Sequence, residues 1–332
     1  GLLFGVGIRD QSQDLMGPIL SQPDVVADRI IEVISHQFQD GSTLHNYFKL
    51  TGQGEKTGHS DTPLWLPLAV TTYIKETGDF GFLDRLVGFQ DGGKPAVVLD
   101  HIIRTVDYTL SNLTPNDLPK FGPGDWNDTL DYVGRKGIGE SVWVAEFLCF
   151  ILREMIELLG QLDDSEMASI ADRYREHYTK IADALNTRCW DGEWYIRGTR
   201  DDGGVVGSSK NEEGCIFLNA QSWAVIAVLH PKAGQKSVWN QLTRCWILLV
   251  GRRCSILPIQ RSIPVSDLQH GAFQGRRKTA PFSTIRRVGE YWLSACLEMA
   301  IEPTNGTASA CRWFKHTTRT STKWSLTSIQ NM

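Results

Sequence analysis

The chain of 332 residues lacks three features that would assign it to particular classes of protein. No apolar run reaches the roughly 18–20 residues that a membrane-spanning helix needs. The seven cysteines form no CxxC pair and no zinc-like spacing, so we expect free thiols and no metal site. The first seven residues carry no charged segment and no cleavage pattern, so no secretory signal peptide is expected. These absences point away from membrane proteins and from disulfide-rich secreted domains.

What is present is a globular composition, with 41% hydrophobic and 22% charged residues. The length is sufficient for one large domain or two smaller ones. Eleven tryptophans are many for such a chain. Aromatic rings suit the faces of sugars, but they also fill large helical cores, so this excess by itself does not decide between the two.

A change in charge divides the chain near residue 229. The net charge is −4, yet residues 1–229 hold 34 acidic and 19 basic side chains, whereas residues 230–332 hold 4 and 15. A basic tail often indicates contact with nucleic acid or membrane. Here the basic residues follow no ordered motif of a known binding module, so we expect neither partner.

Apolar spacing near the helical period predicts six helices. They cover residues 24–38, 63–77, 96–113, 140–159, 165–187 and 219–227, and the helix at 140–159 is apolar enough to be buried. Long Gly-rich loops lie between them, and Trp194–Arg197 is predicted as a short strand in a hairpin. Such helix pairs favour an all-α toroid. A closed barrel of six pairs needs about twelve helices, of which this part supplies about half.

The densest group of reactive side chains lies in Gly122–Asp128, which reads GPGDWND. Gly and Pro set a sharp loop here, and two carboxylates, an amide and an indole follow within four residues. A carboxylic acid beside an indole that limits water can have its pKa raised enough to act as a general acid. The alternative is that Asp125 or Asp128 caps a helix and that Trp126 belongs to the core.

Seven further stretches accompany this loop in a fixed order. They are Gly7–Asp14, Gln37–Ser42 with His45, Leu64–Ala69, Tyr73–Asp79, Gly139–Trp143, Trp190–Tyr195 and Leu218–Trp223. In this order and spacing, residues 1 to about 227 resemble the inverting glycoside phosphorylases of glycoside hydrolase family 94. That family includes cellobiose, cellodextrin and chitobiose phosphorylases and the phosphorylase-like part of cyclic β-1,2-glucan synthases.

The resemblance implies an (α/α)6 barrel behind an N-terminal β-sandwich. The sandwich and the first barrel helices would precede Gly1, so we expect the chain to be a fragment. Residues 1–227 are then an incomplete (α/α)6 catalytic barrel. Residues 228–332 are expected to form a divergent, poorly ordered or non-native tail.

The reaction implied by the resemblance is reversible phosphorolysis of a β-glucoside with inversion, giving an α-sugar 1-phosphate. One carboxylic acid protonates the leaving oxygen, and phosphate replaces the general base and its water. Asp128 matches the general acid of the family, whereas Asp125 is expected to be structural. Inorganic phosphate is the co-substrate, and no organic cofactor or metal is implied.

Two residues near the start of the chain match positions that meet the substrate in this family. Arg9 suits phosphate because a guanidinium group binds oxyanions as a fixed fork. Asp14 can accept hydrogen bonds from sugar hydroxyls. The alternative for Arg9 is a local salt bridge with Asp10 or Asp14. His45 and His59 are expected to be loop residues without a role in ligand binding.

The remaining substrate-binding candidates are Trp126, Asn127, Glu140 and Gln221. Trp126 should lie near the sugar that is bound next to the general acid. The alternative for Glu140 is a cap on the buried helix that follows it. The alternative for Gln221, as for Trp223, is a place in the core.

The sequence departs from the family after Ala227. A Lys-Glu-Asn-Gly-x-x-Phe-x-His motif and a Thr-Gly pair, which serve the acceptor sugar and phosphate in the family, are not legible there. Codons that permit Arg277–Ile285 can also encode most of the missing motif two bases later. One hypothesis is therefore a frameshift near residue 227, and the other is a divergent tail with its own role. With part of the phosphate site missing, weak or absent activity is expected of the chain as written.

Three classes of function remain open at this stage. The first is a cytoplasmic glycoside phosphorylase, homodimeric when intact, as the resemblance implies. The second is an inverting hydrolase on the same barrel, which needs a second carboxylate to activate water, with Glu140 or Glu213 as candidates. The third is a non-enzymatic, truncated carbohydrate-binding remnant.

Overall fold

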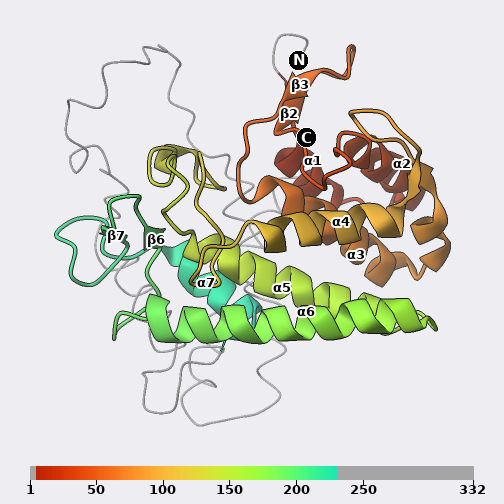
Figure 1. Ribbon diagram of the computed structural model, residues 1–332. Helices are drawn as coiled ribbons and strands as arrows, with labels where there is room; N and C mark the ends of the chain where they lie inside the picture. The colour runs from red at the N-terminus through yellow and green to blue at the C-terminus, as the bar shows by residue number, and fades with distance from the viewer. Residues whose placement is uncertain (1–4, 230–332) are drawn as a thin grey trace, which may run out of the picture. The chain divides into compact units, whose positions relative to one another are not determined.

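Helices dominate the computed structural model, which describes residues 5–229 (Figure 1). The α-helices of this part are α1 (Ile8–Leu15), α2 (Pro23–Ile34), α3 (Trp65–Thr77), α4 (Val98–Ser111), α5 (Val142–Leu159), α6 (Ser165–Ala184) and α7 (Leu218–Ile226). Shorter helical turns are η1 (Thr62–Leu64), η2 (Phe80–Asp84), η3 (Asp128–Leu130) and the π-helical η4 (Leu185–Cys189).

The strands of the described residues are two residues long and form three small antiparallel sheets. These sheets are β1 (Val6–Gly7) with β2 (Asn46–Tyr47) and β3 (Gly54–Glu55), β4 (Leu86–Val87) with β5 (Ala96–Val97), and β6 (Gly198–Thr199) with β7 (Val205–Val206). In the first sheet Val6 pairs with Tyr47. Just beyond it, the Ile8 amide donates to the His45 carbonyl at 3.0 Å. The start of α1 is thereby held beside the loop that carries His45.

Helix α5 lies in the apolar core and packs against α3, α6 and α7. Every residue from Val142 to Cys149 is buried, as predicted for this helix, because an apolar sequence on all faces has no side suited to water. Figure 1 shows α6 running alongside it. The Phe147 ring lies 4.7 Å from Trp65 and 4.9 Å from Trp223 between centroids. Burial of each such side chain stabilises the fold by about 2–3 kcal/mol.

Local sequence sets several helix ends. Pro23 begins α2, where its missing N–H costs nothing. Gly78 ends α3 with φ +71°, a left-handed conformation that glycine adopts without strain. Ser141 caps α5 by accepting from the Val144 amide, and Asp164 caps α6 by accepting from two amides. These end signals can be read from single residues. They lie close to the helix ends that the apolar spacing predicts.

The six helices predicted from the sequence are present as α2 to α7, with ends shifted by a few residues. Helix α1 is an addition. Its sequence is polar and buries only Ile8 and Ser12, so no apolar period marks it. The all-α prediction is confirmed, whereas the predictions for residues 230–332 lie outside the described residues.

The strand predicted at Trp194–Arg197 was wrong, because the two-residue ladder begins one residue later, at β6. The backbone contacts of this segment stay isolated, since Tyr195 bridges Trp190 alone and the Arg197 N–H donates to the Val206 carbonyl at 2.7 Å. The Gln221 amide accepts from the Tyr195 N–H at 3.1 Å and donates to the Tyr195 carbonyl at 2.7 Å. The segment is therefore extended without belonging to a sheet.

Among residues 5–229, none of the helices combines the length with the apolar character that crossing a membrane requires.

Replacement of Asp164 by alanine should lower the free energy of unfolding by about 1 kcal/mol, because the first turn of α6 loses two hydrogen bonds to the cap. Urea denaturation followed by circular dichroism measures this change. Asp163→Ala, at the exposed neighbouring carboxylate, is the matched control and should have a smaller effect. Equal effects of the two substitutions would contradict the capping role.

Candidate active site

The GPGDWND loop is fixed by the segment that precedes η1. The Ser60 amide and hydroxyl both donate to the Gly124 carbonyl, at 3.0 and 3.3 Å, and the hydroxyl also donates to Phe121. The His59 ring lies directly on Gly124, where an added Cβ would come within 2.8 Å of Nε2. Any larger residue at this position would therefore force the imidazole ring to shift.

Asp125 is fully buried and has structural partners. Both of its carboxylate oxygens accept from Arg197 Nη2 at 2.6 Å, and one accepts from the Ser141 hydroxyl at 2.7 Å. The other also accepts from the Asn127 amide at 3.0 Å. Arg197 is itself fully buried. This arrangement agrees with the structural role expected for Asp125.

Asp128 has the opposite environment, although it lies three residues further along the same loop. It begins η3, and 71% of its side chain is exposed. The Asn127 side chain caps this turn by accepting from the Thr129 amide at 3.2 Å and its hydroxyl at 2.7 Å. One Asp128 oxygen accepts from Arg9 Nη2 at 3.1 Å. The loop therefore presents Asp128 outward and uses Asn127 to shape the turn.

Arg9 links α1 to this loop. Its Nη1 donates to the Trp126 carbonyl at 3.1 Å and to the Asp125 carbonyl at 3.5 Å. The same atom lies 3.8 Å from Asp61 Oδ2, and only 13% of the Arg9 side chain is exposed. Burial opposes the charge of Arg9, but Asp61, Asp128 and then Asp10 outweigh it and raise its pKa above the ordinary value.

Asp61 was not singled out from the sequence, because an acid before an apolar helix resembles an ordinary cap. It is fully buried, and its Oδ2 accepts from the Trp65 indole at 2.9 Å. Its Oδ1 has no hydrogen-bond partner among the residues that the structure describes. Burial raises the pKa of Asp61 to about 6, although Arg9 and the indole favour the charged form.

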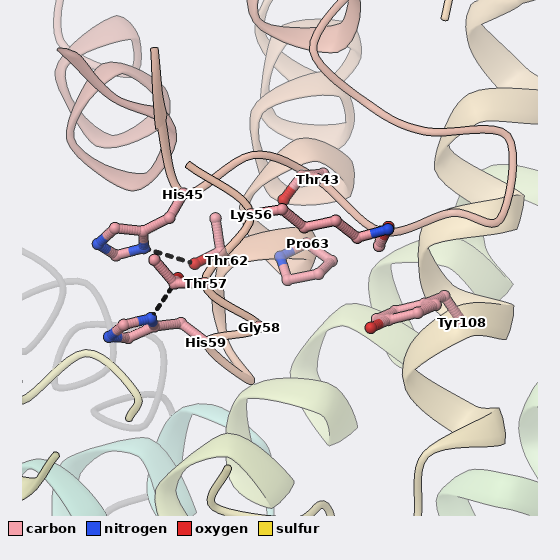
Figure 2. Close-up of a pocket in the computed structure, with 10 residues that line it drawn as sticks. Thr43, His45, Lys56, Thr57, Gly58, His59, Thr62, Pro63 and Tyr108 are labelled. Carbon is pink, nitrogen blue, oxygen red and sulfur yellow. Dashed lines mark hydrogen bonds between the residues drawn. The ribbon is translucent and has the colours of Figure 1, made fainter. Parts of the chain in front are cut away.

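His45 and His59 form a stacked pair in a small pocket (Figure 2), with ring centroids 4.1 Å apart. Nδ1 of His45 lies 3.3 Å from the Thr62 hydroxyl, and Nδ1 of His59 lies 2.6 Å from the Thr57 hydroxyl. Their other ring nitrogens face the same side in Figure 2.

The stacked pair is held neutral by its surroundings. Burial, and then the neighbouring imidazole and Arg9, lower the pKa of His45 to about 4. Burial also lowers the pKa of His59, and Asp128 opposes this. Both histidines lie on loops, as expected, but they share the electrostatic environment of Arg9 and Asp128. No motif or spacing in the sequence predicts this proximity.

The other predicted substrate residues have mixed surroundings. Trp126 is half-buried, and its ring lies 6.1 Å from that of Trp143, so it borders both the loop and the core. Asp14 is exposed near the end of α1. These placements leave their predicted role in sugar binding as a prediction.

Glu140 and Gln221 are engaged by protein groups. Glu140 is buried and accepts from Thr114 at 2.6 Å and Asn116 at 2.9 Å. It does not cap α5, because that position belongs to Ser141. Gln221 pairs with the Tyr195 backbone, as described above. Both side chains thus have structural partners, and their substrate-binding role also stays a prediction.

Within residues 5–229, no group of three His, Cys, Asp or Glu side chains has the geometry to hold a metal ion.

Loss of one partner of the buried Arg197–Asp125 pair should destabilise the protein by about 3 kcal/mol or more, because the other charge is left buried without compensation. Asp125→Asn tests this by chemical denaturation. The matched control is Asp100→Asn, which breaks the exposed pair with Arg104, and surface pairs contribute little. A comparable loss of stability in both variants would contradict the larger contribution that is expected of the buried pair.

Stability should fall as the pH drops from about 6.5 to about 4, in part because of His45. Its charged form is disfavoured in the folded protein, so the unfolded chain binds more protons in this window. His45→Asn should reduce the loss of stability between pH 7 and pH 4.5, as measured by thermal unfolding at each pH. An unchanged pH dependence in this variant would contradict the neutral state of the folded imidazole.

Comparison with known proteins identifies the family and agrees with the fold. Residues 1–244 match the model of the glycosyl hydrolase 94 superfamily catalytic domain. The chain is 35% identical over 246 residues to the solabiose phosphorylase of Paenibacillus borealis, covering 73% of this chain and 31% of that protein. It is 34% identical to the 3-O-beta-D-glucopyranosyl-beta-D-glucuronide phosphorylase of the same organism, covering 66% and 29%. The chain thus spans less than a third of these relatives.

Among solved structures, a rhamnosidase from Klebsiella oxytoca with rhamnose bound superposes with a TM-score of 0.51 at 15% identity, covering 72% of this chain and 42% of that one. This likeness concerns the fold alone and agrees with the predicted (α/α)6 class. The family match over residues 1–244 shows that the chain belongs to the glycosyl hydrolase 94 superfamily, in its catalytic domain.

Proposed function

We propose that this catalytic domain, when intact, performs phosphorolysis of a β-glucoside with inversion, giving an α-sugar 1-phosphate. Family membership supports this proposal, as do two relatives whose names describe phosphorylases. In the proposed step, phosphate attacks the anomeric carbon from the face opposite the leaving group. The bond from that carbon to the glycosidic oxygen breaks, and Asp128 donates its proton to this oxygen. No second carboxylate is needed, because phosphate arrives as an anionic nucleophile.

The contrast between the two carboxylates of the loop carries the proposal. Asp125 is buried and bound to Arg197, so it is unavailable to a substrate. Asp128 is largely exposed, lies two residues after Trp126 and has Arg9 as its protein partner. A general acid must reach the leaving oxygen within hydrogen-bond distance. Of the two, only Asp128 has the exposure that this contact requires.

Arg9 enters the proposal as the phosphate-binding residue, with Asp14 and Trp126 on the sugar. In the free protein the Nη2 of Arg9 is used by Asp128. A phosphate oxygen would therefore compete with that carboxylate for the guanidinium. Such competition suits the reaction, because an acid released from a cation accepts a proton more readily.

Phosphate dependence tests the proposed reaction. The protein is incubated with cellobiose, laminaribiose, sophorose or chitobiose, with and without inorganic phosphate. We expect α-sugar 1-phosphate, detected by ³¹P NMR, only when phosphate is present. Release of free sugars independent of phosphate would favour the hydrolase instead. Binding of sugar without any turnover would support a carbohydrate-binding role.

Substitution of the acid tests its assignment. Asp128→Asn should lower turnover by about a thousand-fold or more, while sugar binding, measured by calorimetry, is retained. Asp131→Asn is the matched control, since Asp131 lies in the same region and pairs with Arg135. Unchanged turnover in Asp128→Asn would remove the general-acid role.

A further inference from the structure

Three carboxylates surround the Arg9 guanidinium, and they differ sharply in burial. Asp128 lies 3.1 Å from Nη2, and Asp10 lies 3.9 Å from Nε with 67% of its side chain exposed. Asp61 lies 3.8 Å from Nη1 and is fully buried. Water screens the exposed charges much more than the buried one. At nearly the same distance from Arg9, the buried Asp61 therefore has a stronger electrostatic effect on the guanidinium than the exposed Asp10.

The surroundings of Asp61 hold it in place for this interaction. The Trp65 indole fixes one oxygen, and the other has no hydrogen-bond partner among residues 5–229. A buried anion with an unsatisfied oxygen is costly unless a cation compensates it. Arg9 is the cation within ion-pair distance. Asp61 is therefore buried beside Arg9, and Arg9 also contacts Asp128, the proposed acid.

We propose that Asp61 is a positioning residue that shares the Arg9 guanidinium with Asp128 and so weakens the attraction of that guanidinium for the Asp128 carboxylate. This inference rests on the proposed function, in which Asp128 is the general acid. An acid that faces an uncompensated arginine gives up its proton early. A buried anion on the other side of the same guanidinium offsets that attraction.

The remaining charged groups near Arg9 do not supply this compensation. His45 and His59 face both Arg9 and Asp128, but they are neutral near pH 7 because their pKa values are lowered. Asp125 is compensated by its own arginine. Asp10 is exposed and screened. Asp61, whose pKa is about 6, is ionised at pH 7 and remains as the unscreened counter-charge.

The test is a titration of aspartate carboxyl carbons by ¹³C NMR on the full chain. Asp61→Asn removes the charge and leaves an amide oxygen that can still accept from Trp65. We expect the midpoint of the Asp128 titration to fall by about half a pH unit or more. Asp10→Asn, which removes an exposed carboxylate at a similar distance from Arg9, is the matched control and should shift it by less than half as much.

A second variant makes the test independent of how well Asp61→Asn folds. Arg9→Met removes the shared cation, so the titration midpoints of Asp61 and Asp128 should both rise. An Asp128 midpoint that stays unchanged in Asp61→Asn, or an Asp61 midpoint that stays unchanged in Arg9→Met, overturns the proposal. These readouts do not depend on turnover. Failure of charge sharing is therefore distinguishable from failure of phosphorolysis, which the phosphate-dependent assay judges.

Discussion

The buried ion pair between Arg197 and Asp125 is the interaction on which the site depends. It joins the segment before β6 to a loop about 70 residues earlier in the chain, and Ser141 at the start of α5 bonds to both partners. Inside a protein such a pair is stable only with good geometry and additional hydrogen bonds. The hydroxyl and the Asn127 amide provide those bonds. The loop is therefore anchored to the helical core before any substrate is considered.

The anchored loop explains why one carboxylate is buried and the other is exposed. Once Asp125 is turned inward, the capped turn at Asn127 directs Asp128 outward towards Arg9. The guanidinium in turn holds the backbone of Trp126. A buried, paired carboxylate and a largely exposed one are thus separated within four residues.

Much of the fold could be predicted from the sequence, because helix positions depend on local apolar spacing and on caps such as Gly78. The sequence also singles out Asp128, since the GPGDWND loop concentrates its signal in adjacent residues, and its role as general acid stays a prediction. Asp61, the His45–His59 stack and the role of Arg197 were not. Each depends on contacts between distant segments, such as the 3.8 Å approach of Arg9 to Asp61. The polar α1 was missed for a related reason, because β1 and tertiary contacts stabilise it rather than an apolar face.

The close approach of His59 to Gly124 limits how this loop can vary over evolutionary time. A methyl group at position 124 would meet the imidazole ring at 2.8 Å, so even an alanine there displaces His59 from its stack on His45. A substitution at this point of the loop therefore also changes the pocket that the two imidazoles line.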